Sequence, residues 1–148
     1  MLKYRKYKAS SNNELTNGKV YAKAVVNQTI GIDGLARHMA KHNTVFSRGV
    51  IKGFLTDMVD CVQELTLEGI AVKIDDLAIF SVGIESKGAE SAEEFNAATN
   101  IKGYKLRARA TGSYRKAALK QVATIKEMDD YDGKLTNTNA GDNEPTNP

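Results

Sequence analysis

The sequence contains no tryptophan, one cysteine and two prolines, Pro145 and Pro148. A single cysteine excludes an internal disulfide framework and any zinc site built from several cysteines. Cys61 lies among apolar residues, so we expect it to be a small buried side chain. The chain has 148 residues, of which 41% are hydrophobic, which is enough for one domain with appendages.

Long apolar runs are missing as well. The longest apolar-rich segment, residues 77–84, is far too short to cross a bilayer. The basic start, residues 1–9, is not followed by the apolar stretch of a secretory signal. We therefore expect a cytoplasmic protein with no membrane partner.

Negative charge is absent from residues 100–126, although this stretch is rich in lysine and arginine. Acidic residues collect instead in residues 85–94 and 127–144. This separation favours a basic surface that faces a polyanion, although an ordinary solvated helix and strand face explains it equally well. The candidate nucleic-acid-binding residues are Lys102, Lys105, Arg107, Arg109, Arg115, Lys116 and Lys120.

The first half of the chain predicts two strands and then two helices. Residues 2–8 and 19–26 read as extended segments joined by a polar loop. Apolar residues at helical spacing predict a short helix from Ile32 that ends near Asn43. Ser47 is a good N-cap for a longer helix that closes at Gly69, a residue suited to a left-handed cap. The apolar stripe of this second helix is wide, which indicates burial on more than one side.

The second half predicts a sheet and a last helix. Residues 70–74 and 77–84 form a hairpin around Asp75 and Asp76, and residues 85–100 form a long exposed loop or ribbon tip. Residues 104–110 alternate between apolar and basic side chains, as in a half-buried strand with a cationic outer face. The last helix, residues 114–122, should turn Ala118, Leu119 and Val122 inward. The tail has little to bury and is predicted to be disordered.

No group of residues indicates catalysis or metal binding. His38 and His42 share a helix face, but Met39 stands where a zinc protease needs glutamate, so two exposed histidines are the better interpretation. Asp75 and Asp76 are explained by a turn without any acid–base role. We therefore expect a non-enzymatic protein with no cofactor, no metal and no small-molecule substrate.

Three segments resemble the HU/IHF family of bacterial histone-like DNA-binding proteins. Residues 69–82 are similar to the family's sheet signature, with Phe80 and Val82 in matching positions. Ser47-Arg48 resembles the family's Ser-Lys helix start, and residues 113–122 resemble its basic last helix. The resemblance covers residues 35–122, and the extended N-terminus and acidic arm tip are similar to a Bacteroidetes-type HU-like subgroup. This sequence differs from the family's sheet signature at the turn, where Asp76 and Ala78 stand in place of glycines.

The resemblance implies an α+β fold: two N-terminal helices, a three-stranded antiparallel sheet with a β-arm, and a C-terminal helix, in an intertwined homodimer. The expected domains are an N-terminal β extension (1–28), an HU/IHF-like DNA-binding domain (29–126) and a disordered acidic tail (127–148). The expected dimer core comprises Phe54, Met58, Val62, Leu65 and Phe80. Family arms carry a proline that wedges between base pairs, whereas the equivalent residues here, 88–95, are acidic and contain no proline, which argues against strong bending.

Three functions remain open at this point. The first is sequence-tolerant binding of duplex DNA through phosphate contacts, as in a nucleoid-associated protein. The second is a structural or interaction protein that keeps the dimer but has weak DNA affinity, because the acidic tip and tail repel phosphate. The third is RNA binding, which aromatic platforms on a sheet would favour, but the only candidates identified, Tyr104 and Tyr114, are too sparse.

Overall fold

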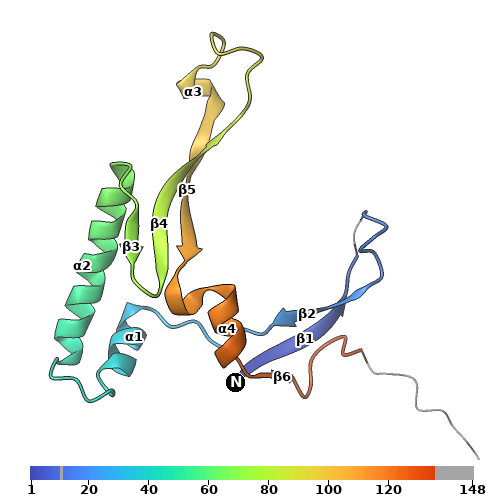
Figure 1. Cartoon of the computed structure of the whole chain (residues 1–148), viewed down its shortest axis with the longest axis vertical. Helices are drawn as coiled ribbons and strands as arrows, with labels where there is room; N and C mark the ends of the chain where they lie inside the picture. Colours follow the sequence, from blue (N-terminus) through green and yellow to red (C-terminus); the bar gives the residue numbers. More distant parts are fainter. Residues whose placement is uncertain (11, 136–148) are drawn as a thin grey trace, which may run out of the picture. The chain divides into compact units, whose positions relative to one another are not determined.

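The computed structural model describes residues 1–10 and 12–135. The larger part of the predicted disordered tail, residues 136–148, lies outside the described residues. The chain divides into two compact units (Figure 1). The terminal unit combines Met1–Gln28 with the chain from Ala123 onward, and the central unit is Thr29–Val122.

The terminal unit is a three-stranded sheet in the order β2-β1-β6. The predicted extended segments are confirmed as β1 (Leu2–Lys8) and β2 (Val20–Ala24), which pair antiparallel. The third strand, β6 (Ile125–Glu127), runs parallel to β1 and had not been expected. Strand β6 spans the expected domain boundary at residue 126, and the chain continues to contact β1 at Met128.

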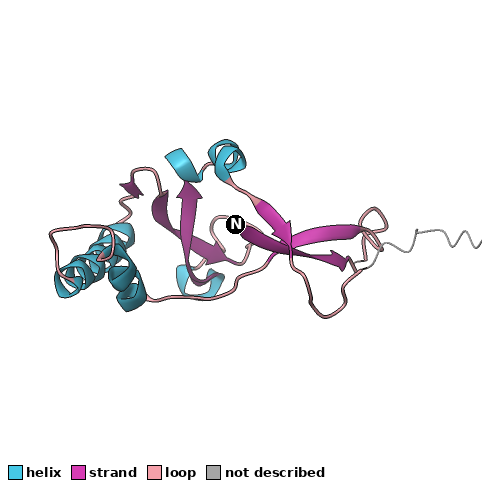
Figure 2. Ribbon diagram, turned by 90° about the horizontal axis from the view of Figure 1, so that it is seen from below, coloured by secondary structure: helices cyan, strands magenta, loops and turns pink. Residues whose placement is uncertain are grey.

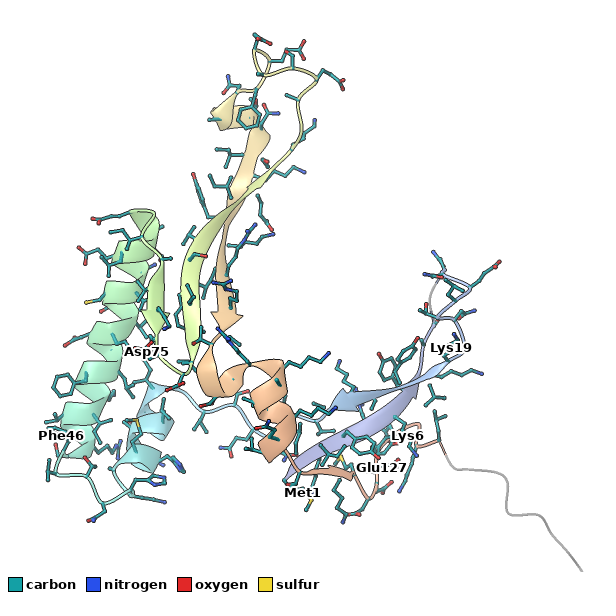
Figure 3. All side chains as sticks on the ribbon, viewed as in Figure 1. Met1, Lys6, Lys19, Phe46, Asp75 and Glu127 are labelled. Atoms are coloured by element: carbon teal, nitrogen blue, oxygen red, sulfur yellow. The ribbon has the colours of Figure 1, made fainter. Side chains whose placement is uncertain are left out.

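Polar contacts hold the chain after β6 in place. The Met128 amide donates to the Tyr4 carbonyl, at 2.9 Å, and the Lys6 ammonium lies 3.0 Å from the Glu127 carboxylate (Figure 3). The Tyr131 hydroxyl accepts from the Lys6 backbone amide and donates to Glu127, at 3.0 and 2.9 Å. Hydrogen bonds from Lys6 and Tyr131 lower the pKa of Glu127, and the hydrogen bond with Glu127 raises the pKa of Lys6.

The central unit begins with the two predicted helices, α1 (Ile32–Met39) and α2 (Arg48–Leu67). The Ser47 hydroxyl caps α2 as expected, by accepting from the Val50 amide at 3.4 Å. Helix α1 ends earlier than the predicted Asn43. Asp33 connects the two helices through an ion pair to Arg48, at 2.8 Å, and the hydrogen bond from Arg48 lowers the pKa of Asp33.

The end of α2 follows the predicted left-handed cap at Gly69, whose φ is +83°. The Gly69 amide bonds to the Thr66 carbonyl, and the Ile70 amide bonds to the Leu65 carbonyl. These two bonds form a Schellman motif, which satisfies the last carbonyls of the helix and turns the chain into the sheet.

The central sheet has the order β3-β4-β5, with β3 (Val72–Ile74), β4 (Ala78–Ser86) and β5 (Ile101–Ala110) all antiparallel. The predicted turn between β3 and β4 is confirmed, with Asp76 in the left-handed region at φ +59°. Gly112, at φ +48°, packs so closely on this turn that a β-carbon would overlap with Asp76. The turn therefore fixes the path of the chain as it leaves β5.

Strands β4 and β5 continue well beyond β3 as a two-stranded arm (Figure 1). The tip closes through a short helix, α3 (Ala97–Asn100), and through the buried Asn100 side chain. The Asn100 amide group donates to the carbonyls of Lys87 and Gly88, and its carbonyl oxygen accepts from the Asn96 amide. The predicted exposed tip is thus an ordered loop held by one buried asparagine.

The last elements of the central unit are a 3₁₀ turn, η1 (Gly112–Tyr114), and α4 (Lys116–Val122). Ala118 is half-buried, but Leu119 is 41% exposed and Val122 is 75% exposed, so the prediction that all three turn inward is wrong for the last two. The prediction that Cys61 is buried is also wrong, because this cysteine is exposed.

The single chain has a small core. In Figure 2, α1 and α2 lie together at one side of the central sheet, and α2 contacts β3 and β4. Among the described residues, the buried hydrophobic side chains are those of Ala36, Ile51 and Ala78, and no large side chain is fully buried. Within the same part of the chain, no helix has the length and apolar character to span a membrane.

Candidate nucleic-acid interface

The register of the central sheet separates basic from apolar side chains. Residues directly opposite each other in an antiparallel ladder project from the same face. Lys105 is opposite Gly83, Arg107 is opposite Ser81, and Arg109 is opposite Ile79. These positions share one face, which we call the cationic face, and the predicted cationic outer face of the strand is placed there.

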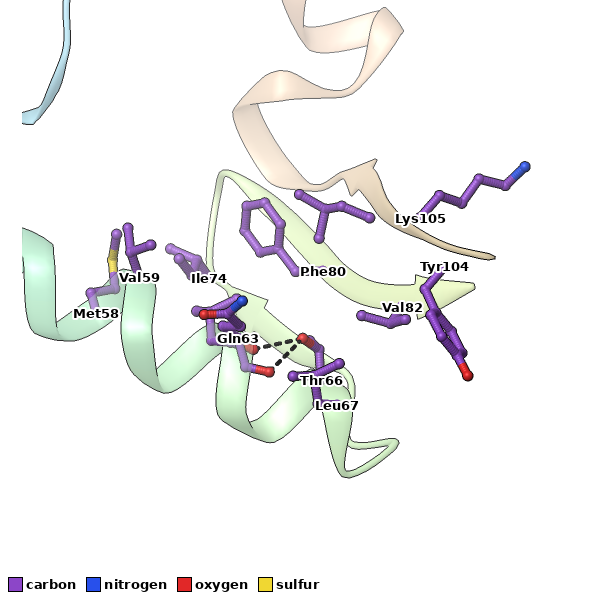
Figure 4. A pocket seen from close by; sticks show the side chains of 12 residues that line it. Met58, Val59, Gln63, Thr66, Leu67, Ile74, Phe80, Val82, Tyr104 and Lys105 are labelled. Carbon is purple, nitrogen blue, oxygen red and sulfur yellow. Dashed lines mark hydrogen bonds between the residues drawn. The ribbon is translucent and has the colours of Figure 1, made fainter. Parts of the chain in front are cut away.

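The other face of the sheet is apolar and faces α2. It contains Phe80 opposite Ala108, and Val82 opposite Leu106. Between this face and α2 lies a groove of about 480 Å³ (Figure 4). The groove is lined by Met58, Val59, Val62, Gln63, Thr66, Leu67, Ile74, Phe80, Val82, Tyr104, Lys105 and Leu106.

The side chains of the cationic face are accessible. Lys105, Arg107 and Arg109 are all exposed, and the Lys105 ammonium lies 2.6 Å from the Glu85 carboxylate. Within the described residues, Arg107 and Arg109 make no ion pair. The two guanidinium groups are therefore available to an external anion.

Lys73 is a cation of this face that had not been included among the candidates. It lies on β3 opposite Ile79, in the same row as Arg109. Its ammonium lies 2.7 Å from the Asp75 carboxylate, and the hydrogen bond from Lys73 lowers the pKa of Asp75. The strand alternation in residues 72–74 was the signal that could have identified it.

The remaining four candidates lie outside these rows. Lys102 sits at a β-bulge, because Ser86 is opposite Ile101 while Glu85 is opposite Gly103. Arg115 immediately precedes α4, and Lys116 and Lys120 share a face of that helix. All four are exposed. Helix α4 packs mainly on η1 and, in the described chain, has no extensive contact with the sheet.

The expected dimer-core residues are only partly covered in the single chain. Phe54 is 63% exposed, Met58 is 40% exposed and Leu65 is 37% exposed, while Val62 and Phe80 are half-buried. On the arm side of the groove, the apolar face is open as well. Leu106 is 65% exposed there.

The arm tip and the two histidines match the expectations from sequence. The tip carboxylates of Glu90, Glu93 and Glu94 are exposed. His38 and His42 are exposed and face each other, with 3.1 Å between their Nε2 atoms. No group of three or more potential metal ligands is found in the described part of the chain.

Over residues 1–126, the chain matches the model of a protein family described as HU-HIG: HU domain fused to wHTH, Ig, or glycine-rich motif. The chain belongs to the HU-HIG family. The predicted resemblance to the HU/IHF proteins is therefore confirmed at the level of the HU domain. No curated protein matches this HU-HIG chain.

A solved structure has a similar fold. It is the crystal structure of a protein from Bacteroides vulgatus ATCC 8482 that is described as a candidate bacterial DNA-binding protein. The TM-score is 0.63 and the sequence identity 15%, and the match covers 86% of this chain. The chain spans about half of that protein, 47% of its length. The likeness confirms the mixed α and β fold.

Proposed function

We propose that this HU-HIG chain binds duplex DNA with little sequence preference, through the cationic face of the central sheet. The observation that carries the proposal is the register of β4 and β5. It directs Lys105, Arg107 and Arg109 to one exposed face and leaves Arg107 and Arg109 without carboxylate partners in the described chain. The HU domain of the family and the description of the Bacteroides vulgatus protein support the same choice of ligand.

The chemistry is neutralisation of phosphates. Lysine and arginine contacts to phosphate oxygens release condensed counterions, which supplies affinity without reading the bases. Arginine adds a planar, bidentate geometry that fits phosphate oxygens. We propose that further phosphate contacts along the duplex come from four other exposed cations: Lys102, Arg115, Lys116 and Lys120. This function needs no catalytic group and no cofactor.

The binding unit is proposed to be a homodimer. A single chain buries few apolar side chains, leaves Met58 and Leu106 exposed at an apolar groove of about 480 Å³, and leaves Phe54 exposed on α2. A second copy that packs on α2 and on the apolar face of the arm would remove these surfaces from water, and each large side chain so buried contributes roughly 1.5–3 kcal/mol. Of the residues expected in the dimer core, Met58, Val62 and Phe80 line this groove, and Phe54 and Leu65 are exposed on α2.

The arm is proposed to follow the duplex without wedging into it. Wedging requires an apolar side chain that is inserted between base pairs. Phe95 is an exposed apolar side chain at the tip, but Glu90, Glu93 and Glu94 are exposed beside it in the sequence, and these carboxylates repel phosphate. We expect little bending of the DNA.

A second candidate function is a structural or interaction protein with weak DNA affinity. The Glu85–Lys105 ion pair and the acidic tip favour it, because both reduce the positive potential along the arm. A gel-shift assay with a random-sequence duplex at low ionic strength separates the two functions. Micromolar or tighter binding that is weakened in Arg107→Glu supports DNA binding, and absence of a shift in the unmodified protein supports the interaction protein.

A further inference from the structure

The terminal unit has a second basic face, separate from the one on the central sheet. In β1, alternate residues share a face, and the register adds the residues opposite them. Arg5 is opposite Lys23, Tyr7 is opposite Tyr21, and Lys3 is opposite Lys126. We call this set the tyrosine face: Lys3, Arg5, Tyr7, Tyr21, Lys23 and Lys126. The other face of the same sheet includes Leu2, Val20, Ala22, Ala24 and Ile125.

The tyrosine face contains two cross-strand pairs of like charge, Arg5 opposite Lys23 and Lys3 opposite Lys126. Like charges in this position destabilise a sheet. Lys126 has a carboxylate partner, Asp129 at 2.9 Å. Arg5 and Lys23 are exposed and, within the residues that the structure describes, make no ion pair. Packing of the sheet does not explain why two cations lie opposite each other here. A bound polyanion would explain the pair, because its negative charge would offset the repulsion.

The two tyrosines add flat, accessible ring surfaces beside these cations. The ring centroids of Tyr7 and Tyr21 lie 6.1 Å apart with an interplanar angle of 33°. Tyr7 is 44% exposed and Tyr21 is 38% exposed. Aromatic rings next to phosphate-binding cations form stacking platforms for unpaired bases, because every base has a π-face. In a duplex, these base faces are covered by neighbouring pairs.

We propose that the tyrosine face binds a single-stranded polynucleotide, with its phosphates on Arg5 and Lys23 and its bases on Tyr7 and Tyr21. Strand β1 rises about 3.3 Å per residue, so Lys3 to Tyr7 span roughly 13 Å. This length suits a short unpaired segment. The site lies in a different unit from the cationic face and goes beyond the proposed binding of duplex DNA.

The charge test uses the full chain and fluorescence anisotropy with labelled oligo(dT), oligo(U) and a random duplex. Arg5→Glu should weaken oligonucleotide binding several-fold. It removes a cation that neutralises phosphate, and the new carboxylate repels the strand. The substitution should not lower the thermal stability, because a glutamate opposite Lys23 replaces a repulsive pair with an attractive one. Lys8→Glu is the matched control. Lys8 is exposed on the same strand but opposite Val20, on the other face, and its reversal should leave oligonucleotide binding unchanged.

The stacking test compares two substitutions of one ring. Tyr21→Phe keeps an aromatic surface and should keep most of the affinity for oligo(dT). Tyr21→Val keeps a good strand-forming residue without a ring, and should weaken oligo(dT) binding roughly fivefold or more, since stacking contributes about 1–3 kcal/mol per base. The oligo(U) arm shows whether RNA and DNA strands bind alike, and binding of either unpaired strand supports the proposal.

Variants of the two faces distinguish binding at the tyrosine face from duplex binding at the cationic face. The reversal Arg107→Glu/Arg109→Glu should weaken duplex binding and spare most oligo(dT) binding, and Arg5→Glu should do the converse. Unchanged oligo(dT) and oligo(U) binding in Arg5→Glu and Tyr21→Val would overturn the second site, even when the duplex site is intact. An equal reduction of duplex and oligo(dT) binding in Arg5→Glu would also overturn it, because the face would then not distinguish unpaired strands.

Discussion

The side chain of Arg107 lies across Gly83, which is not its direct cross-strand neighbour. Arg107 is opposite Ser81, but a β-carbon at Gly83 would overlap with the guanidinium of Arg107. The arginine therefore crosses the arm diagonally, and the absence of a side chain at position 83 leaves room for it.

Gly83→Ala should displace this guanidinium and weaken duplex binding a few-fold. The fold should tolerate the change, because the group in the way is the far end of a flexible side chain and the backbone of Gly83 is not in the left-handed region. Gly103→Ala is the control, since Gly103 is in the same ladder and a β-carbon there meets nothing within 4 Å. Binding by gel shift and thermal unfolding by circular dichroism would be measured for both. Equal affinities would show that the position of Arg107 does not matter.

Gly112→Ala should destabilise the central unit by roughly 1–3 kcal/mol, which is the usual cost of strained backbone. Its φ of +48° disfavours a side chain, and a β-carbon would come within 2.8 Å of the Asp76 α-carbon. Gly53→Ala, in α2 with open space around it, should instead stabilise by about 0.5–1 kcal/mol. Urea unfolding compares the two. If Gly112→Ala left the free energy of unfolding unchanged, the turn at Asp76 would not fix the path of the chain after β5.

Met58→Asp should abolish dimerisation and folding together, because a charge at the centre of the proposed dimer core would be buried without a partner. The unmodified protein should sediment as a dimer at micromolar concentration. Asp57→Asn, on the neighbouring exposed position of α2, should leave sedimentation unchanged. A well-folded monomer in the unmodified protein would contradict the proposed assembly.

Acid should release β6 from β1. The hydrogen bonds from Lys6 and Tyr131 lower the pKa of Glu127, so the carboxylate favours the docked strand at neutral pH and this effect disappears as the pH falls below about 4. The raised pKa of Lys6 keeps its charge throughout this range. The protection factors of the β6 amides, which compare the observed exchange rate with the intrinsic rate at the same pH, should therefore fall at pH 3. Glu127→Gln should show low protection of β6 at neutral pH already, and Glu93→Gln, at the exposed tip, should not. General acid unfolding is excluded as the cause if β4 and β5 stay protected at pH 3.

Local signals in the sequence predicted much of the central unit. Ser47 and Gly69 mark the two ends of α2, and both were predicted because a helix cap depends only on residues close in sequence. The turn at Asp75-Asp76 was predicted for the same reason. Parallel pairing of β6 with β1 joins residues more than a hundred positions apart, so no local pattern indicates it. Asn100 closes the arm tip through backbone groups of Lys87 and Gly88, which composition alone cannot reveal.

The candidate site shows the same division. Alternation along residues 104–110 was enough to separate Arg107 and Arg109 from Leu106. The exposure of Cys61 and Val122 could not be obtained in this way, because it depends on which neighbours pack against α2 and α4. Tyr7 and Tyr21 were not recognised as a platform, because only the register of the hairpin brings the two rings together.

Replacement of the tip carboxylates should distinguish a passive arm from a wedging one. Glu90→Gln/Glu93→Gln/Glu94→Gln should bind duplex DNA as well as the unmodified protein or more tightly, because three repulsive charges are removed. A circular-permutation gel assay should show little bending in either protein. A sharp bend would show that the arm inserts into the stack despite its acidic tip.

The most direct test of the cationic face is duplex affinity across a salt series. Log affinity should fall linearly with log salt in the unmodified protein. In Arg107→Glu/Arg109→Glu, affinity should drop for every sequence alike, and the slope should flatten by about 0.9 for each phosphate that the protein no longer neutralises. Lys41→Glu, an exposed cation after α1, should change neither the affinity nor the slope. An unchanged affinity and slope in the double reversal would contradict the assignment of DNA binding to this face.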